Sequence, residues 1–362
     1  MKINTITCHD VYNPGASLQA YALARYLQKR GHDVRIIDYK PDYLSRHYSL
    51  TAVSNPVFDR PGVRLAYLAA KLPGRLRASK SLRKKRFDAF TEQYLPLTKK
   101  RYASCDELKA DSPVADVYLA GSDQIWNTLF PNGRDPAFYL DFAPESAVRA
   151  SYAASFATDD VADDCRAQVA SWLGKLDLVS VREASAVQLA ASLGRTDAVQ
   201  VPDPVFLLTA DEWNALASGA DTPDAPYVLV YDFDNNPKLA GFARKKADEL
   251  GCRVLSVFPS EQADITAPDA GPLEFLDLVR NASCVVSNSF HATAFAILFG
   301  VPFAVFDRGE KINTRMRDLL DAFDRAPADD RKETDPAPLA AQRKRAENYL
   351  NQVLTLAEKR QT

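Results

Sequence analysis

The sequence has no long, uninterrupted apolar run. Its opening segment, MKINTITCHDVYNPG, contains no apolar stretch of signal-peptide length. The longest apolar stretch, residues 292–306, is broken by Gly300 and Pro302. A membrane-spanning helix needs about 20 consecutive apolar residues, which neither segment supplies. We therefore expect a cytoplasmic protein, with the inner face of the membrane as an alternative location.

Cysteine pairs, metal-ligand spacings and a strong net charge are also missing. The five cysteines are odd in number and form no CxxC pair; they are Cys8, Cys105, Cys165, Cys252 and Cys284. Scattered cysteines of this kind are typical of reduced thiols, so we expect no disulfide framework and no bound metal. The formal net charge of -2 gives no general attraction to nucleic acid, and no nucleic-acid partner is expected.

Strand and helix patterns alternate along the chain. In the first half, short apolar strands are expected at 34–38, 116–120, 150–155 and 178–181, with helices near 161–173 and 183–193. The pattern starts again after residue 226, with strands at 227–231, 253–258, 284–287 and 303–306 and helices between them. Such alternation is typical of parallel sheets built from βαβ units.

The break between the two halves lies at 215–226, a segment of small residues, aspartate and proline that reads as a linker. We therefore predict an N-terminal Rossmann-like domain at 1–214 and a C-terminal one at 227–335. A charged amphipathic helix at 336–362 would pack across both. Two such domains facing each other across a cleft form a GT-B-like α/β fold, in which ligands bind at the carboxyl ends of the strands. The fold alone says little about chemistry.

The sharpest local signal is VSNSFHAT (286–293), where a buried strand passes into a helix. Backbone N–H groups at a helix N-terminus bind anions, and Ser289 and Thr293 add hydroxyl groups. His291 would then neutralise a phosphate or donate a proton. The alternative is that Ser289 only caps the helix and His291 is a half-buried structural residue.

A second signal, GSDQIWN (121–127), directly follows a strand. Its polar side chains suit a sugar, and the indole of Trp126 would offer an apolar face for stacking. An Asx turn beside a core tryptophan explains the same residues. The polar side chains are those of Ser122, Asp123, Gln124 and Asn127.

Arg182 lies in SVRE (180–183) at another junction of strand and helix, where a guanidinium would grip a carboxylate or phosphate. A surface contact with Glu183 is the alternative. Weaker candidates stand beside other predicted strand ends or helix starts. They are Asn13, Gly15, Gln19, Asp203, Asn313 and Arg315.

The segment 71–86 is strongly basic, with eight lysines and arginines interleaved with leucines. A basic amphipathic stretch of this kind rests on anionic lipid in some proteins, which would suit a lipid-linked acceptor. A solvated helix face is the alternative, and the simpler one.

Five of these segments together resemble the polysaccharide pyruvyl transferase family. They follow one another in the family's order and are GSDQIWN (121–127), SYAASFA (151–157), SVREASA (180–186), VPDPVFLL (201–208) and SNSFHATAFAILFGVPF (287–303). NPGASLQAYAL (13–23) and INTRMRDLL (312–320) also look like family segments. The resemblance covers roughly 5–325. The sequence departs from the family at Ala292, where glycine is usual, and a methyl group there narrows the approach to the backbone.

The resemblance implies transfer of a pyruvyl group from phosphoenolpyruvate, as co-substrate, to a sugar of a surface polysaccharide or its lipid-linked precursor, giving a ketal. It associates His291 and Arg182 with the donor, to which we add Asn288, Ser289 and Thr293. His291 and Asp123 are the expected acid and base. Acceptor contacts are assigned to Asn13, Gly15, Gln19, Ser122, Asp123, Gln124, Trp126 and Asn127, with support from Asp203, Asn313 and Arg315. A nucleotide-sugar glycosyltransferase and a catalytically silent carbohydrate-binding member are the alternatives.

Overall fold

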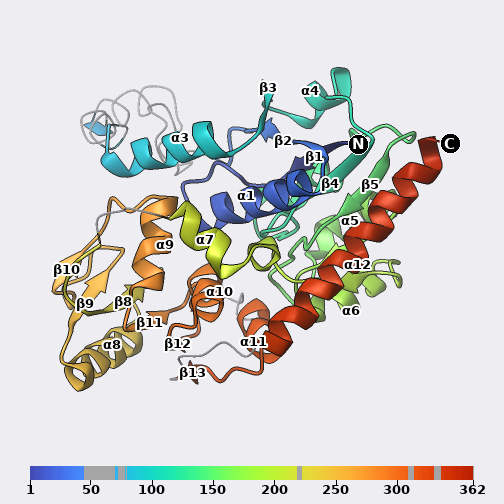
Figure 1. Cartoon of the computed structure of the whole chain (residues 1–362). Coiled ribbons are helices and arrows are strands. Elements are labelled where there is room, and N and C mark those ends of the chain that lie inside the picture. The colour runs from blue at the N-terminus through green and yellow to red at the C-terminus, as the bar shows by residue number, and fades with distance from the viewer. Residues whose placement is uncertain are drawn as a thin grey trace.

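Parallel strands and helices alternate through both halves of the computed structural model (Figure 1), which describes residues 1–44, 70–71, 78, 80–217, 222–308, 314–329 and 336–361. Asn313 and residues 72–77 and 79 of the basic segment 71–86 lie outside these described residues. No helix in the described ranges is both long and apolar enough to cross a membrane.

The first half of the chain forms a five-stranded parallel sheet in the order β3-β2-β1-β4-β5. Its elements are β1 (Lys2–Ile6), α1 (Pro14–Lys29), β2 (Asp33–Tyr39), α3 (Leu82–Tyr94), β3 (Leu97–Tyr102), α4 (Cys105–Ala110), β4 (Val117–Ala120), η2 (Pro131–Arg134), η3 (Pro136–Tyr139), β5 (Val148–Ser151), α5 (Asp163–Leu173), β6 (Ser180–Val181), α6 (Ala184–Ser192) and β7 (Val199–Gln200). Strands β6 and β7 pair in parallel, and isolated bridges connect β6 and its flank to the β5 side of the sheet.

The second half forms a six-stranded sheet in the order β10-β9-β8-β11-β12-β13, parallel except for its last pair. Its elements are β8 (Tyr227–Tyr231), α8 (Pro237–Leu250), β9 (Arg253–Ser256), β10 (Ile265–Thr266), α9 (Pro272–Arg280), β11 (Cys284–Ser287), α10 (Phe290–Phe299), β12 (Phe303–Val305), α11 (Thr314–Ala322) and β13 (Ala328–Asp329). Both sheets reverse their strand order beside their first strand, the doubly wound pattern expected from the sequence.

Local sequence explains where the two helices nearest the site begin and end. The side chain of Asn13 caps α1 by accepting hydrogen bonds from Gly15 N and Ala16 N, and Pro14 occupies the first helical position. Helix α10 begins after Ser289 and ends at Gly300, whose φ of 66° is the left-handed conformation that glycine adopts without strain. α10 is buried on every side, which explains its continuous apolar sequence.

One hydrophobic core runs through both halves. Between them, the chain passes through η4 (Pro204–Leu207) and α7 (Ala210–Leu216). Trp213 of α7 lies fully buried between Tyr21 of α1, at 5.9 Å between ring centroids, and Phe295 of α10, at 5.0 Å. Because the same apolar cluster includes residues from both sheets, burial of this surface holds the two halves together.

The helix expected at the C-terminus forms as α12 (Pro336–Gln361) and returns to the first half of the chain (Figure 1). Tyr349 donates a hydrogen bond to Ser151 O at 2.7 Å, and Arg360 bonds Ala147 O at 2.6 Å. At its other end, Arg343 donates to Phe206 O in η4. α12 therefore packs along the end of the first sheet and the crossing between the halves.

The described part of the basic segment connects the two halves. On α3, Arg83 donates a hydrogen bond to Ala270 O at 2.8 Å, and Arg86 forms an ion pair with Glu274 of α9 at 3.0 Å. These two charges are engaged within the molecule. Contact between 71–86 and lipid stays a prediction.

Candidate active site

A cavity of about 340 Å³ opens between the two halves of the molecule. Its walls come from the loops that follow β1, β4, β8, β11 and β12, at or beside the points where the strand orders reverse. Ligands of doubly wound sheets bind at such points. The described residues that line it are Cys8, Val11, Asn13, Leu44, Asp123, Gln124, Phe130, Asn132, Phe233, Ser289, Phe290, His291, Arg308 and Arg315.

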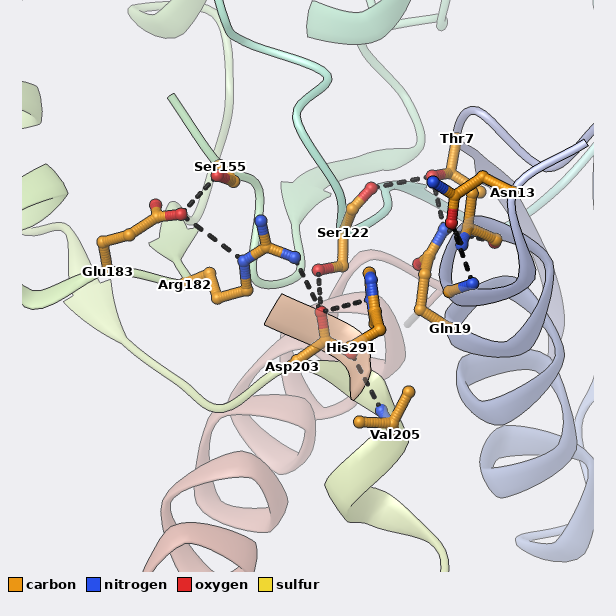
Figure 2. A network of polar contacts seen from close by, with 12 residues as sticks. Thr7, Asn13, Gln19, Ser122, Ser155, Arg182, Glu183, Asp203, Val205 and His291 are labelled. Atoms are coloured by element: carbon orange, nitrogen blue, oxygen red, sulfur yellow. Dashed lines mark hydrogen bonds and ion pairs between the residues drawn. The ribbon is translucent and has the colours of Figure 1, made fainter. Parts of the chain in front are cut away.

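His291 stands where the two halves meet. It lies in the first turn of α10 and is 7% exposed, and its ring packs against Gly15 in the first turn of α1. The N-termini of two helices therefore converge on this imidazole, and their N–H dipoles favour negative charge at this place. Nε2 points to Asp203, 3.6 Å from the carboxylate oxygen, which leaves Nδ1 on the other side of the ring (Figure 2).

Asp203 is the centre of a buried polar network (Figure 2). One carboxylate oxygen accepts hydrogen bonds from Ser122 Oγ at 3.1 Å and Arg182 Nη1 at 2.8 Å, and the other accepts from Val205 N at 3.1 Å. Burial alone would raise the pKa of Asp203. The close contact with His291, then the charge of Arg182 and the hydrogen bond from Val205 N, outweigh burial and hold this pKa well below its ordinary value.

Arg182 lies outside the cavity and contacts residues that form or support its wall. Its guanidinium lies 4.3 Å from the centroid of the Phe290 ring and 3.4 Å from the carboxylate of Glu183, in addition to its bond with Asp203. Arg182 is not among the residues that line the cavity. In this structure Arg182 positions Asp203, because two buried carboxylates hold part of its guanidinium, and its direct grip on a donor stays a prediction.

Arg315 presents its guanidinium to the cavity instead. It is 7% exposed, and no carboxylate in the described part of the chain forms an ion pair with it. With its oxygen turned toward the guanidinium, the amide of Gln124 accepts hydrogen bonds from Nη1 at 2.6 Å and Nη2 at 3.2 Å. Burial, and then the like charge of Arg182, lower the pKa of Arg315 to about 10. Among the described residues, Asp123 and Glu183 act on Arg315 through their charge without forming an ion pair, so its guanidinium has the capacity to bind an anionic ligand.

Asp123 also faces the cavity. Its φ of 74° is left-handed, a conformation that aspartate tolerates better than most residues, and its carbonyl accepts hydrogen bonds from Ile125 N and Ser155 N. These two bonds fix the backbone and aim the half-buried side chain. Among the described residues, none donates a hydrogen bond to its carboxylate, so the carboxylate has the capacity to accept a proton from a ligand.

Several other residues predicted to contact a ligand do not line this cavity, because their side chains are used inside the protein. Trp126 is fully buried, stacked on Tyr139 with ring centroids 5.4 Å apart, and its Nε1 donates to Phe138 O. It offers no face to a sugar. The remaining polar side chains in this group make internal hydrogen bonds and do not line the cavity; they are Gln19, Ser122, Asn127, Asn288 and Thr293.

Among the wall residues that were not singled out from the sequence are Phe130, Phe233 and Arg308. Phe130 and Phe233 are 43% and 36% exposed and face the cavity from opposite halves of the molecule. Arg308 lies beside them, paired with Asp234 and 4.9 Å from the centroid of the Phe233 ring. The only sequence signal for Phe233 as a cavity residue is its position just after the strand YVLVY. No motif marks Phe130. Ala292, the departure from the family pattern, is fully buried and does not line the cavity.

Gly15→Ala should displace the His291 ring. A Cβ at position 15 would lie 2.0 Å from Nδ1, far inside van der Waals contact. We expect the free energy of unfolding to fall by about 1–3 kcal/mol, as in other overpacked cores. Alanine at Gly241 is the control, because a Cβ there meets nothing within 4 Å and alanine favours the helix by up to about 1 kcal/mol. Urea unfolding of both variants checks this; equal stability changes would contradict it.

Asp203→Asn should make the free energy of unfolding depend less on pH in the acidic range. The folded-state pKa of Asp203 is lowered, so its stabilisation is present above the ordinary aspartate pKa of about 3.9 and is lost as the pH falls below it. At pH 7 we expect the variant to lose about 3 kcal/mol, because Arg182 is left buried without this partner. The difference from the native protein should narrow between pH 4 and pH 2. Urea titrations across this range measure it, and a constant difference would argue against the lowered pKa.

Comparison with known proteins places this site in a family. The family model described as polysaccharide pyruvyl transferase matches residues 13–310. The chain belongs to the polysaccharide pyruvyl transferase family. Its cavity, with His291, Asp123 and Arg315 on the walls, is therefore the candidate active site of a transferase that acts on polysaccharide. A search of curated protein sequences finds no match to the chain.

Solved structures resemble this family member in fold. A protein assigned as a UDP-N-acetylglucosamine 2-epimerase from Listeria monocytogenes matches with a TM-score of 0.52 and 11% identity, over 97% of this chain and 88% of that one. The UDP-N-acetylglucosamine 2-epimerase from Rickettsia bellii matches with 0.48 and 14%, over 99% and 97%. A glycosyltransferase from Streptomyces sp. SF2575 matches with 0.42 and 14%, over 99% and 95%. The first match confirms the GT-B-like fold expected from the sequence.

Proposed function

We propose that this chain transfers a pyruvyl group from phosphoenolpyruvate to a sugar of a surface polysaccharide or its precursor, forming a ketal. The observation that carries the proposal is the meeting of His291 and the buried Arg315 on the walls of one cavity between the two sheets. Phosphoenolpyruvate carries a phosphate and a carboxylate, so its site needs two positive poles.

The two poles come from different elements. The first turns of α1 and α10, with His291 between them, would hold one anionic group. The guanidinium of Arg315 would hold the other through paired hydrogen bonds. Arg182 does not line this cavity, and Asp203 and Glu183 engage its Nη1 and Nε. Its role is to hold Asp203, whose carboxylate faces Nε2 of His291.

The chemistry needs one proton donor and one acceptor. Protonated His291 donates a proton to the methylene carbon of phosphoenolpyruvate, which makes C2 electrophilic. A sugar hydroxyl adds to C2 and gives its proton to Asp123, and inorganic phosphate leaves as the C2–O bond to phosphate breaks. A second hydroxyl of the same sugar closes the ketal, and its proton leaves with the phosphate. The balance requires no metal, nucleotide or oxidant.

The acceptor would lie against the exposed aromatic residues. Phe130 and Phe233 offer ring faces at the cavity, the role that sequence reasoning had given to Trp126. Asp123 then stands within the same walls to receive the proton of the attacking hydroxyl.

Phosphate release tests the proposal. The purified protein is incubated with phosphoenolpyruvate and a panel of gluco-, galacto- and manno-oligosaccharides, and inorganic phosphate and product mass are measured. We expect acceptor-dependent phosphate release and a saccharide mass increase that corresponds to one pyruvate ketal. UDP- and GDP-sugars serve as the comparison, because a glycosyltransferase would use them instead. Transfer from a nucleotide-sugar and none from phosphoenolpyruvate would overturn the proposal.

A further inference from the structure

A second cavity of about 340 Å³ lies in the C-terminal half of the molecule. It is formed where β8 and β9 end and α8 begins, on the same edge of the sheet as the first cavity. The mechanism proposed above uses none of the residues that line it. It is nevertheless of the size at which proteins bind small molecules.

The two cavities are direct neighbours. Asp232 lines the second cavity, and Phe233, the next residue, lines the first. Asn288 joins both to α10: its amide donates to Asp232 at 2.6 Å and accepts from Phe233 N at 3.0 Å. The ring of Phe233 also lies 5.5 Å from that of Phe258, which lines the second cavity. The wall between the cavities is therefore about one residue thick.

The second cavity has the chemistry of a neutral, hydroxyl-rich ligand. Ser256 lines it and is 2% exposed, yet no described residue hydrogen-bonds its hydroxyl. Glu261 adds a carboxylate, and Phe258 adds an aromatic face. No lysine or arginine occurs among the described residues of the lining, so a diphosphate would meet Asp232 and Glu261 without a cationic side chain. Carboxylates, hydroxyls and one aromatic ring are suited to sugar hydroxyls and a sugar face.

We propose that the second cavity is a subsite for a neighbouring sugar unit of the acceptor. The acceptor would cross Phe233, with its reacting unit in the first cavity and the next unit against Ser256, Phe258 and Glu261. This inference rests on the proposed function and narrows it: the substrate is an oligosaccharide or polymer, and a monosaccharide is a poor acceptor.

Two substitutions on α8 separate this subsite from the active site. Ala240 lines the second cavity, and Ala240→Phe would fill it. Its sequence neighbour Gly241 does not line it, and a Cβ there meets nothing within 4 Å, so Gly241→Phe is the matched control. Ser256→Ala removes the buried hydroxyl with little change in volume.

Binding is measured on an array of gluco-, galacto- and manno-oligosaccharides of one to four units, and kcat/KM for phosphate release is measured with the members that bind. In the native protein, we expect affinity and kcat/KM to rise about 10-fold from one unit to two or more, the effect of one or two hydrogen bonds. Ala240→Phe should abolish this gain, and Ser256→Ala should reduce it. Both should leave the monosaccharide values within about two-fold, and Gly241→Phe should match the native protein.

Equal affinity for all lengths, no binding to any member, or a gain that survives Ala240→Phe would each overturn the subsite. The array reading needs no phosphoenolpyruvate. Length-dependent binding without phosphate release would therefore support the subsite and count against the proposed transfer, so that the two failures are distinguishable.

Discussion

Replacing His291 by alanine is expected to lower the rate of phosphate release from phosphoenolpyruvate by roughly 100-fold or more, the contribution of a general acid. The reason is its position. Nε2 faces the charged carboxylate of Asp203 at 3.6 Å, and the residue lines the cavity from the first turn of α10. Because Nε2 faces Asp203, Nδ1 is the nitrogen from which the proposed proton transfer would take place. Single-turnover and steady-state assays with saturating donor measure the loss in kcat.

A second substitution separates chemistry from packing. His291→Gln retains an amide N–H that can reach Asp203, but it supplies no proton at neutral pH. It should restore the stability lost in His291→Ala and none of the rate. His32→Ala is the matched control, because His32 is half-buried and absent from the cavity wall. Near-native turnover in either variant at position 291 would remove His291 from the proposed chemistry.

Arg315→Met should abolish donor binding without destabilising the protein. Its buried guanidinium has no carboxylate partner among the described residues, and Arg182 lies close enough to lower its pKa. Removing an unpaired buried charge relieves desolvation and repulsion, so we expect the free energy of unfolding to stay unchanged or rise by about 1 kcal/mol. The KM for phosphoenolpyruvate should rise about 100-fold, which corresponds to the loss of charge-assisted hydrogen bonds of about 1.5–3 kcal/mol.

Arg325→Met provides the contrast. Arg325 is also buried, but Asp329 pairs with it at 2.8 Å, and it does not line the active-site cavity. Removing Arg325 leaves Asp329 buried without this partner, so the free energy of unfolding should fall by about 3 kcal/mol. The KM for phosphoenolpyruvate should stay unchanged. Calorimetry with phosphoenolpyruvate and urea unfolding measure both quantities. A large stability loss in Arg315→Met, or unchanged donor affinity, would show that Arg315 is a structural cation.

The sequence predicted secondary structure well where apolar residues and helix signals agree. Strand 284–287 and the start of a helix at Pro272 are found as expected, because a short buried strand and a proline at the first helical position are local signals. The strand expected at 150–155 ends at Ser151, since Ala153 adopts a φ of 52° that no strand accommodates. α10 begins at Phe290, two residues before the helix expected from Ala292, because Ser289 is its N-cap.

The sequence alone determined the alternation of strands and helices, the family, and the places where chemistry-bearing residues follow a strand. Those are properties of neighbouring residues. Only the tertiary structure decided which side chains face the cavity: GSDQIWN contributes Asp123 and Gln124 to it but buries Trp126, and Arg315 takes the place predicted for Arg182. The reason is that the direction of a side chain depends on what packs behind it. The buried carboxylate of Asp203, which comes from a distant part of the chain, pairs with Arg182 away from the cavity, whereas Arg315 lines it.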